Sequence, residues 1–145
     1  MLIRDFVPAD CEPLVEVLKA NLQFGHPEID GPEAMLRVSE CEAAEFLVAE
    51  EDGRPVGLIR GVFDGSRAIV SVISVHPNYQ RRGIGTALVS EIAKRFKAKG
   101  ANHLSVIAAG NLELLKKLGF KQTIRLMTAY PIDSVISEAS HEGSL

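Results

Sequence analysis

Ala-Ile-Val-Ser-Val-Ile-Ser-Val-His-Pro-Asn-Tyr-Gln-Arg-Arg-Gly-Ile-Gly, residues 68–85, is the stretch that decides the fold of this chain. Its first part, residues 68–75, carries apolar β-branched side chains at odd and even positions, which predicts a strand that contacts protein on both faces. Pro77 ends this strand, because proline cannot donate to a ladder and restrains the residue before it. From Ile84 onward apolar residues recur at helical spacing, so a helix is expected to begin inside the turn.

The turn over residues 80–86 is expected to bind an anion. Backbone N–H groups at a helix start have no intrahelical acceptor, and they converge at the positive end of the helix dipole. Gly83 and Gly85 have no Cβ to hold a ligand away from the backbone, and Arg81 and Arg82 add positive charge. The spacing differs from both the P-loop and the dinucleotide motif Gly-x-Gly-x-x-Gly. The alternative is that the glycines only permit a tight connection and the arginines are solvated.

An apolar strand is followed by Val-x-Pro, Tyr79 and Gln-x-x-Gly-x-Gly, and this order resembles the GNAT superfamily of N-acetyltransferases. The motif of that superfamily is Gln/Arg-x-x-Gly-x-Gly/Ala, and Gln80, Gly83 and Gly85 match it. Lys-x-Leu-Gly-Phe at residues 116–120 is a second resemblance. The resemblance implies that the turn binds the pyrophosphate of acetyl-CoA, the cosubstrate, and that the strand hydrogen-bonds the pantetheine arm. The residues implied in acetyl-CoA binding are Ile73, Val75, Gln80, Arg81, Arg82, Gly83, Ile84, Gly85 and Thr86.

The predicted fold class is α/β with a mixed sheet. Asp52-Gly53 and Asp64-Gly65 are hairpin turns, so the first strands form an antiparallel meander. A helix joins the central strand to the next one, so these two strands should be parallel and should splay to bind acetyl-CoA. The expected strands cover residues 2–6, 46–50, 55–62, 68–75, 103–108, 120–124 and 126–130, and the expected helices cover 11–22, 32–40, 84–99 and 112–118.

Composition sets limits on the kind of protein. A chain of 145 residues, 46% of them hydrophobic, fits one acetyltransferase domain over residues 1–131 followed by a loosely held tail over 132–145. The net charge of −3 argues against a nucleic-acid binder that relies on overall basicity. Because no apolar run is long enough for a membrane span and the start lacks the form of a signal peptide, we expect a cytoplasmic protein. Cys11 and Cys41 have no partners at metal-ligand spacing, so no metal is expected.

Catalytic residues are not assigned by the sequence. Acetyl transfer to an amine needs a neutral amine, a stabilised oxyanion and a proton for the CoA thiolate. In many GNAT enzymes a tyrosine five residues before the Phe of Gly-Phe supplies that proton, but this position is Leu115 here, and Asn111 lies later than the usual asparagine. The central strand holds no acid. Asp64 and Tyr130 are substitutes, although a turn role explains Asp64 and a packing role explains Tyr130.

The acceptor side is expected to involve residues 21–30, because this segment covers the acceptor in GNAT relatives. Phe24 and His26 are therefore candidate substrate contacts, and a core phenylalanine and a surface histidine are the alternative readings. The hypothesis is transfer of an acetyl group from acetyl-CoA to a primary amine of a small molecule by direct attack.

The sequence is also compatible with other functions. The acceptor can instead be a protein N-terminus, and the chain can instead be a catalytically inactive acyl-CoA-binding sensor. A third alternative is that the turn binds another phosphate compound. Edge strands near the C-terminal end would also permit a homodimer.

Overall fold

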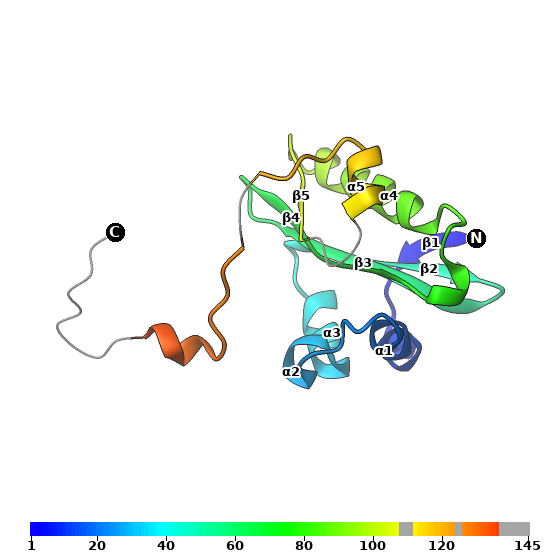
Figure 1. The fold of residues 1–145 in the computed structure, drawn as a ribbon, viewed down its shortest axis with the longest axis horizontal. Coiled ribbons are helices and arrows are strands. Elements are labelled where there is room, and N and C mark those ends of the chain that lie inside the picture. The colour runs from blue at the N-terminus through cyan, green and yellow to red at the C-terminus, as the bar shows by residue number, and fades with distance from the viewer. Residues whose placement is uncertain (108–111, 124–125, 137–145) are drawn as a thin grey trace.

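One mixed sheet organises the part of the chain that the computed structural model describes, residues 1–107, 112–123 and 126–136 (Figure 1). The sheet has five strands in the order β1-β2-β3-β4-β5. Neighbouring strands from β1 to β4 are antiparallel, and β4 and β5 are parallel. The predicted meander with a parallel pair at its end is therefore confirmed. The strands are β1 (Leu2–Asp5), β2 (Ala44–Glu51), β3 (Arg54–Phe63), β4 (Ala68–Val75) and β5 (Ser105–Val106).

Helices cover both faces of the sheet. Figure 1 shows α1, α2 and α3 on one face and α4 with α5 on the other. The helices are α1 (Cys11–Ala20), α2 (Pro27–Asp30), α3 (Pro32–Ser39), α4 (Ile84–Ala98) and α5 (Leu112–Lys117). The sequence did not predict α2, a single turn that begins with proline at its first position. Among the described residues, no helix is long and apolar enough to cross a membrane, and no cluster of His, Cys, Asp and Glu is arranged to hold a metal ion.

Two apolar layers hold these elements together. On the α4 face, β-strand residues such as Ile59 and Val70 pack against Leu88 and Phe96. On the other face, Leu58 packs in a cluster with residues of α1 and α3. Successive strand residues point to opposite faces, so a strand covered by helices on both sides needs apolar residues at both parities. The apolar composition of the second half of β4, Val72 to Val75, therefore follows from its place between two helical layers, whereas Ile69 in the first half is exposed.

A β-bulge interrupts β4. Arg60 pairs with Val72 and Gly61 pairs with Val70, so Ser71 is an extra residue with no partner in the β3–β4 ladder. The bulge shifts the alternation: Val70 and Ile73 both face α4 in spite of their odd separation. Gly61 permits the close approach there, because a Cβ on this residue would lie 2.4 Å from the Ile69 carbonyl oxygen.

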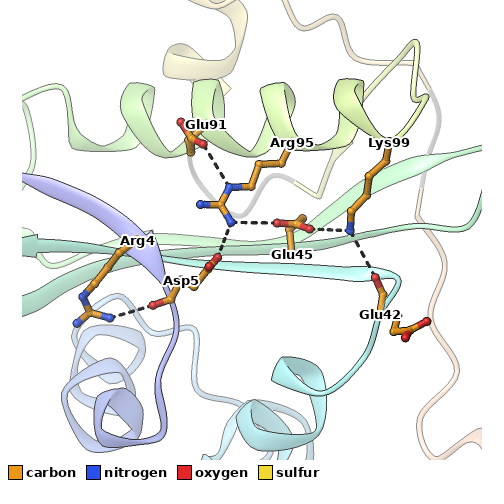
Figure 2. Close-up of polar contacts among 7 residues, drawn as sticks. All are labelled: Arg4, Asp5, Glu42, Glu45, Glu91, Arg95 and Lys99. Atoms are coloured by element: carbon orange, nitrogen blue, oxygen red, sulfur yellow. Dashed lines mark hydrogen bonds and ion pairs between the residues drawn. The ribbon is translucent and has the colours of Figure 1, made fainter.

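Ion pairs fasten α4 to the meander (Figure 2). The Arg95 guanidinium lies 3.2 Å from Glu91 Oε2 and 3.3 Å from Glu45 Oε1, and it also pairs with Asp5. Lys99 Nζ lies 2.6 Å from Glu45 Oε2. These contacts join β1, β2 and the last turns of α4. They hold the helix in a set position, and with it the turn at its N-terminus.

The last two predicted strands are wrong. Residues 120–123 and 126–130 form no strand, and residues 124–125 lie outside the described residues. Leu126 and Met127 are 67% and 92% exposed, so they bury little apolar surface that would repay the entropy of ordering a strand. The preceding strand is also shorter than predicted, with Ser105–Val106 alone paired to β4. The homodimer was expected from edge strands near the C-terminal end, and the described residues 126–130 form no such strand.

The predicted tail over residues 132–145 begins with a short 3-10 helix at Ile132–Val135. Residues 137–145 lie outside the described residues, and so does Asn111. The division of the chain into residues 1–131 and a tail stays a prediction.

Candidate active site

The open edge of β4 is the first part of the site. β4 pairs with β5 only through Ile69 and Val70, so no described strand lies beside it from Ile73 to Val75. On the β3 side, the His76 backbone N–H donates to the Val56 carbonyl over 2.8 Å. Peptide groups alternate along an antiparallel ladder, so those of Ile73 and Val75 point away from β3 into the open edge. These are the two strand positions that the sequence analysis named.

Amide side chains bind the carbonyls of this edge. Asn21 Nδ2 donates to the Val75 carbonyl at 2.8 Å and to Ser74 Oγ at 2.7 Å. Gln80 Nε2 donates to the same Val75 carbonyl at 2.8 Å, and Gln23 Nε2 donates to the Ile73 carbonyl at 3.2 Å. With the carbonyls occupied, the outward N–H groups of the strand are the donors left for a ligand. Sequence reasoning missed the contacts of Asn21 and Gln23 with β4, although two amide residues at the C-terminal end of a predicted helix were the signal that was available.

The turn between β4 and α4 has the backbone that an anion site needs. Arg81 and Gly83 have φ of 65° and 83°, and Gly83 is the N-cap of the 15-residue helix α4. The first helical bond runs from the Ala87 N–H to the Gly83 carbonyl at 3.0 Å, so the N–H groups of residues 84–86 have no helical acceptor. A left-handed conformation favours glycine at position 83. The helix dipole adds a partial positive charge at this point.

Gly85 has a second reason to be glycine. A Cβ on this residue would lie 3.0 Å from Leu114 Cδ2, because α5 packs across the first turn of α4. The packing of α5 is therefore a reason for glycine at position 85 in addition to the clearance for a ligand that the sequence predicted. It also brings Lys117 of α5 to the cleft, a positive charge that sequence reasoning did not identify.

These parts line one cleft of about 600 Å³. Every residue that the sequence analysis named for acetyl-CoA lies on its wall except Arg82. The Arg82 guanidinium instead lies over the Tyr79 ring, 5.0 Å from its centroid, and donates to the Asn78 carbonyl at 3.3 Å. The other residues that line the cleft are Asn21, Gln23, Ser74, Tyr79, Leu114 and Lys117. The cleft thus joins strand donors at one end to a helix N-terminus at the other.

The catalytic candidates lie outside this cleft. Leu115 is 4% exposed and belongs to the packed side of α5, away from the lining. Asp64 lies in the β3–β4 turn, at the opposite end of β4 from the cleft, and its carboxylate accepts the backbone N–H groups of Arg67 and Ser66 at 2.7 and 2.8 Å. Those two bonds lower the pKa of Asp64. This arrangement explains Asp64 as a turn residue.

Tyr130 contacts α2 and not the cleft. Its hydroxyl donates to Glu28 Oε1, and its ring stacks on His26 with centroids 4.0 Å apart. The hydrogen bond lowers the pKa of Glu28 and raises the pKa of Tyr130, because it favours the ionised carboxylate and the protonated phenol. Phe24 packs partly into the core beside α1, with Lys19 Nζ 5.3 Å from its ring centroid. The structure therefore separates Phe24 and His26, which the sequence had grouped.

Solved acetyltransferases share this fold. The PaiA N-acetyltransferase of Thermoplasma acidophilum, in complex with coenzyme A, superposes with a TM-score of 0.76 over 83% of this chain and 89% of its own, at 22% identity. An aminoglycoside N-acetyltransferase, AAC(6')-Iy in complex with CoA, gives a TM-score of 0.74 over 90% of this chain and 94% of its own, at 18% identity. At these identities the likeness concerns the fold.

Sequence comparison gives the family. An acetyltransferase of Yersinia pestis (strain Pestoides F) is 40% identical over 107 residues, 74% of this chain and 75% of its own. Acetyltransferase SG1711 of Sodalis glossinidius is 41% identical over 66 residues, so the match spans about half of each chain, 46%. The model of the acetyltransferase (GNAT) family matches residues 13–120. The chain therefore belongs to the GNAT family and is an acetyltransferase.

Proposed function

We propose that the chain binds acetyl-CoA in the cleft and transfers the acetyl group to a primary amine of a small molecule. One observation carries this proposal: outward strand donors and the unpaired N–H groups of a helix N-terminus lie on the wall of the same cleft. The pantetheine arm carries amides that can pair with β4 as another strand would. The pyrophosphate carries the negative charge that the start of α4 attracts.

The phosphate end is assigned to the turn and its basic neighbours. The N–H groups of Ile84, Gly85 and Thr86 face the ligand, and Arg81 and Lys117 lie on the same wall. Arginine and lysine strengthen phosphate binding through charge-assisted hydrogen bonds. Gln80 has a different role, since its amide fixes the end of β4.

The reaction is a direct attack. The amine nitrogen forms a bond to the thioester carbonyl carbon, the C–S bond breaks, and the CoA sulfur takes up the proton that the amine releases. A thiol with an ordinary pKa of about 8.5 is a good leaving group, so the absence of a tyrosine at Leu115 is compatible with turnover. Alignment of amine and thioester in the cleft supplies the rate through proximity.

A small acceptor is favoured over a protein N-terminus by the cover on the acceptor side. Residues 21–31 pass over the sheet, held at one end by Asn21 and Gln23 and at the other by Arg60, which donates to the Ile29 carbonyl at 2.9 Å. We expect this cover to favour a small amine over a peptide on the acceptor side. AAC(6')-Iy, which has the same fold, is named for a small-molecule acceptor.

The test measures the thermal midpoint of the protein with acetyl-CoA and with ATP as the control phosphate ligand. At about a hundredfold over its Kd, a native-state ligand adds roughly 2.7 kcal/mol, which raises the midpoint of a chain of this size by about 5–10 °C. A rise with acetyl-CoA alone supports the proposal. An equal rise with ATP would show a general phosphate site, and no rise would refute acetyl-CoA binding.

Release of free CoA with a panel of small amines and of peptides then separates the acceptor classes. We expect turnover with small amines, and its loss in Gly85→Glu. Gly53→Glu, in the exposed β2–β3 hairpin, is the control for the added negative charge. Turnover with peptides alone would make the chain a protein N-terminal acetyltransferase, and acetyl-CoA binding without any turnover would leave the sensor function.

A further inference from the structure

Arg60 is a buried cation with an unused donor. The residue is 7% exposed, on the middle of β3, and its Nη1 atom is buried with no hydrogen-bond partner among the described residues. Buried polar groups in proteins are almost always paired, and an unpaired charged donor costs the most. An orphaned guanidinium nitrogen in the core of a small protein therefore calls for a ligand or a function.

The other contacts of Arg60 do not explain its charge. Nη2 donates to the Ile29 carbonyl of α2 at 2.9 Å, and the guanidinium carbon lies 5.7 Å from the Phe46 ring centroid. Asp30 is the carboxylate that interacts with it electrostatically. Asp30 Oδ2 accepts the backbone N–H groups of Gly25 and His26 at 2.9 and 3.2 Å, and no hydrogen bond or ion pair joins Asp30 to Arg60 among the described residues. The guanidinium thus lacks the paired carboxylate that its planar fork would bind best.

Arg60 lies next to the acetyl-transfer cleft. It pairs with Val72 across the β3–β4 ladder, and both side chains point to the α1 face of the sheet. Val72 adjoins Ile73, whose carbonyl binds Gln23 on the wall of the cleft. The cofactor turn lies on the α4 side, so the α1 side is the side from which an acceptor can approach β4. Arg60 is the buried cation on that approach.

Ile29 and Asp30 of α2 lie against Arg60, and the segment around them, residues 22–31, is weakly held. None of them except Gly31 is buried, and α2 has no buried residue at all. Polar contacts hold α2 in place: Arg60 binds the Ile29 carbonyl, Arg37 binds the Glu28 carbonyl at 3.2 Å, and Tyr130 binds the Glu28 carboxylate. A segment with few apolar contacts opens at low free-energy cost. When it opens, both terminal nitrogens of Arg60 become available.

We propose that Arg60 binds a carboxylate on the acceptor, so that the substrate is a small amine that also carries a carboxylate group. A carboxylate replaces the Ile29 carbonyl on Nη2, satisfies the orphaned Nη1, and forms two parallel hydrogen bonds. The amine end then points toward Ile73 and the thioester. This inference rests on the proposed function, and it separates this chain from enzymes that acetylate polycations, because a second positive charge beside Arg60 is repelled.

The test compares matched acceptors that differ only in the carboxylate. CoA release is measured with the standard α-amino acids, β-alanine and γ-aminobutyrate, and with the carboxamide of each. For each pair, kcat/KM of the carboxylate member is divided by kcat/KM of its carboxamide. Because amine basicity differs within a pair, the readout is this ratio in each variant relative to the same ratio in the wild type. Arg60→Met keeps an apolar stem over Phe46 and removes the charge. Arg60→Lys keeps the charge and removes the fork. Arg37→Met is the control, because it removes another arginine contact to α2.

We expect the wild type to prefer the carboxylate member of at least one pair. Arg60→Met should reduce that preference at least about tenfold, Arg60→Lys should retain part of it, and Arg37→Met should leave it unchanged. The inference is overturned if the preference for the carboxylate persists in Arg60→Met, or if the wild type acetylates only the carboxamide members of the pairs. Either result leaves the proposed function standing. An equal loss in Arg37→Met would overturn it too, since loosening of α2 would then be the cause.

A second readout does not depend on turnover. The thermal midpoint is measured with saturating CoA, alone and with each member of the acceptor pairs. A further rise with an amino acid, absent with its carboxamide and absent in Arg60→Met, supports the carboxylate site. If CoA raises the midpoint and no amino acid raises it further, the carboxylate inference fails and the proposed function stands. If CoA itself has no effect, the proposed function fails instead.

Discussion

Asn21 Nδ2 donates a hydrogen bond of 2.8 Å to the Val75 carbonyl, and this contact joins the end of α1 to the end of β4 across 54 positions of sequence. The same amide group reaches Ser74 Oγ, and Asn21 Oδ1 accepts from Gln80 Nε2 at 3.3 Å. One side chain therefore positions both the open strand edge and the glutamine that begins the GNAT motif. The segment after α1 and the turn before α4 therefore meet at this residue.

Asn21→Ala should weaken acetyl-CoA binding about tenfold and lower the free energy of unfolding by about 1–3 kcal/mol, because Val75 and Ser74 lose a partner. Isothermal titration and denaturant unfolding measure the two effects. Asn102→Ala, in the exposed connection after α4, is the control and should change neither. Unaltered acetyl-CoA affinity in a folded Asn21→Ala protein would exclude this role.

Gly83→Ala and Gly53→Ala form a matched pair. Both glycines have left-handed φ, 83° and 75°, and a Cβ on either meets no atom within 4 Å. Each substitution should therefore cost about 1–2 kcal/mol of stability through backbone strain alone. Gly83→Ala should also raise the Kd for acetyl-CoA, because its Cβ enters the anion turn, while Gly53→Ala should not. If both variants bind acetyl-CoA as the wild type does, the turn does not contact the pyrophosphate.

Tyr130→Phe should leave kcat and its alkaline pH dependence unchanged, since the hydroxyl contacts Glu28 and does not line the cleft. The substitution should raise the pKa of Glu28, which the Tyr130 hydroxyl now lowers. NMR titration of the Glu28 carboxyl measures that shift. A large fall in kcat would instead restore Tyr130 as the general acid.

The sign of the pH effect follows from the same pair. The lowered pKa of Glu28 contributes stability above its unfolded-state pKa, and this contribution is lost as the pH falls through the folded-state value. The raised pKa of Tyr130 contributes stability below its unfolded-state pKa, and this is lost as the pH rises through the folded-state value. The contact is therefore strongest between the ordinary pKa values of glutamate and tyrosine. Tyr130→Phe should therefore weaken the pH dependence of stability both in the acidic range, where Glu28 titrates, and in the alkaline range, where Tyr130 titrates.

Arg95→Met should lower stability by about 1–2 kcal/mol, because three carboxylates share this half-buried guanidinium (Figure 2). Lys97→Met, at an exposed position of the same helix, is the control and should stay within about 0.5 kcal/mol of the wild type. The difference between the two variants should shrink at high salt, as expected for partly exposed ion pairs. Urea unfolding at low and high ionic strength measures it.

The C-terminal part shows where local sequence reasoning fails. Residues 126–130 have the composition of a strand, yet Leu126 and Met127 are exposed and no ladder forms. A strand is stable only where a neighbouring strand and an apolar layer accept it, and neither condition is visible in a short window of sequence. The hairpins of the meander were predictable because an Asp-Gly turn between two apolar strands specifies their pairing locally.

Sequence alone predicted the strand, turn and helix of residues 68–98 and the meander before them. It also named a set of residues that, except for Arg82, all line the cleft, because each of these features depends on neighbours within a few positions. Only the tertiary structure decided the bulge at Ser71, the amide contacts of Asn21 and Gln23 and the orphaned guanidinium of Arg60. These features depend on which segments the packed core brings together across many positions of the chain. Local propensity carries no information about such contacts, so folding had to place these residues before their roles could be inferred.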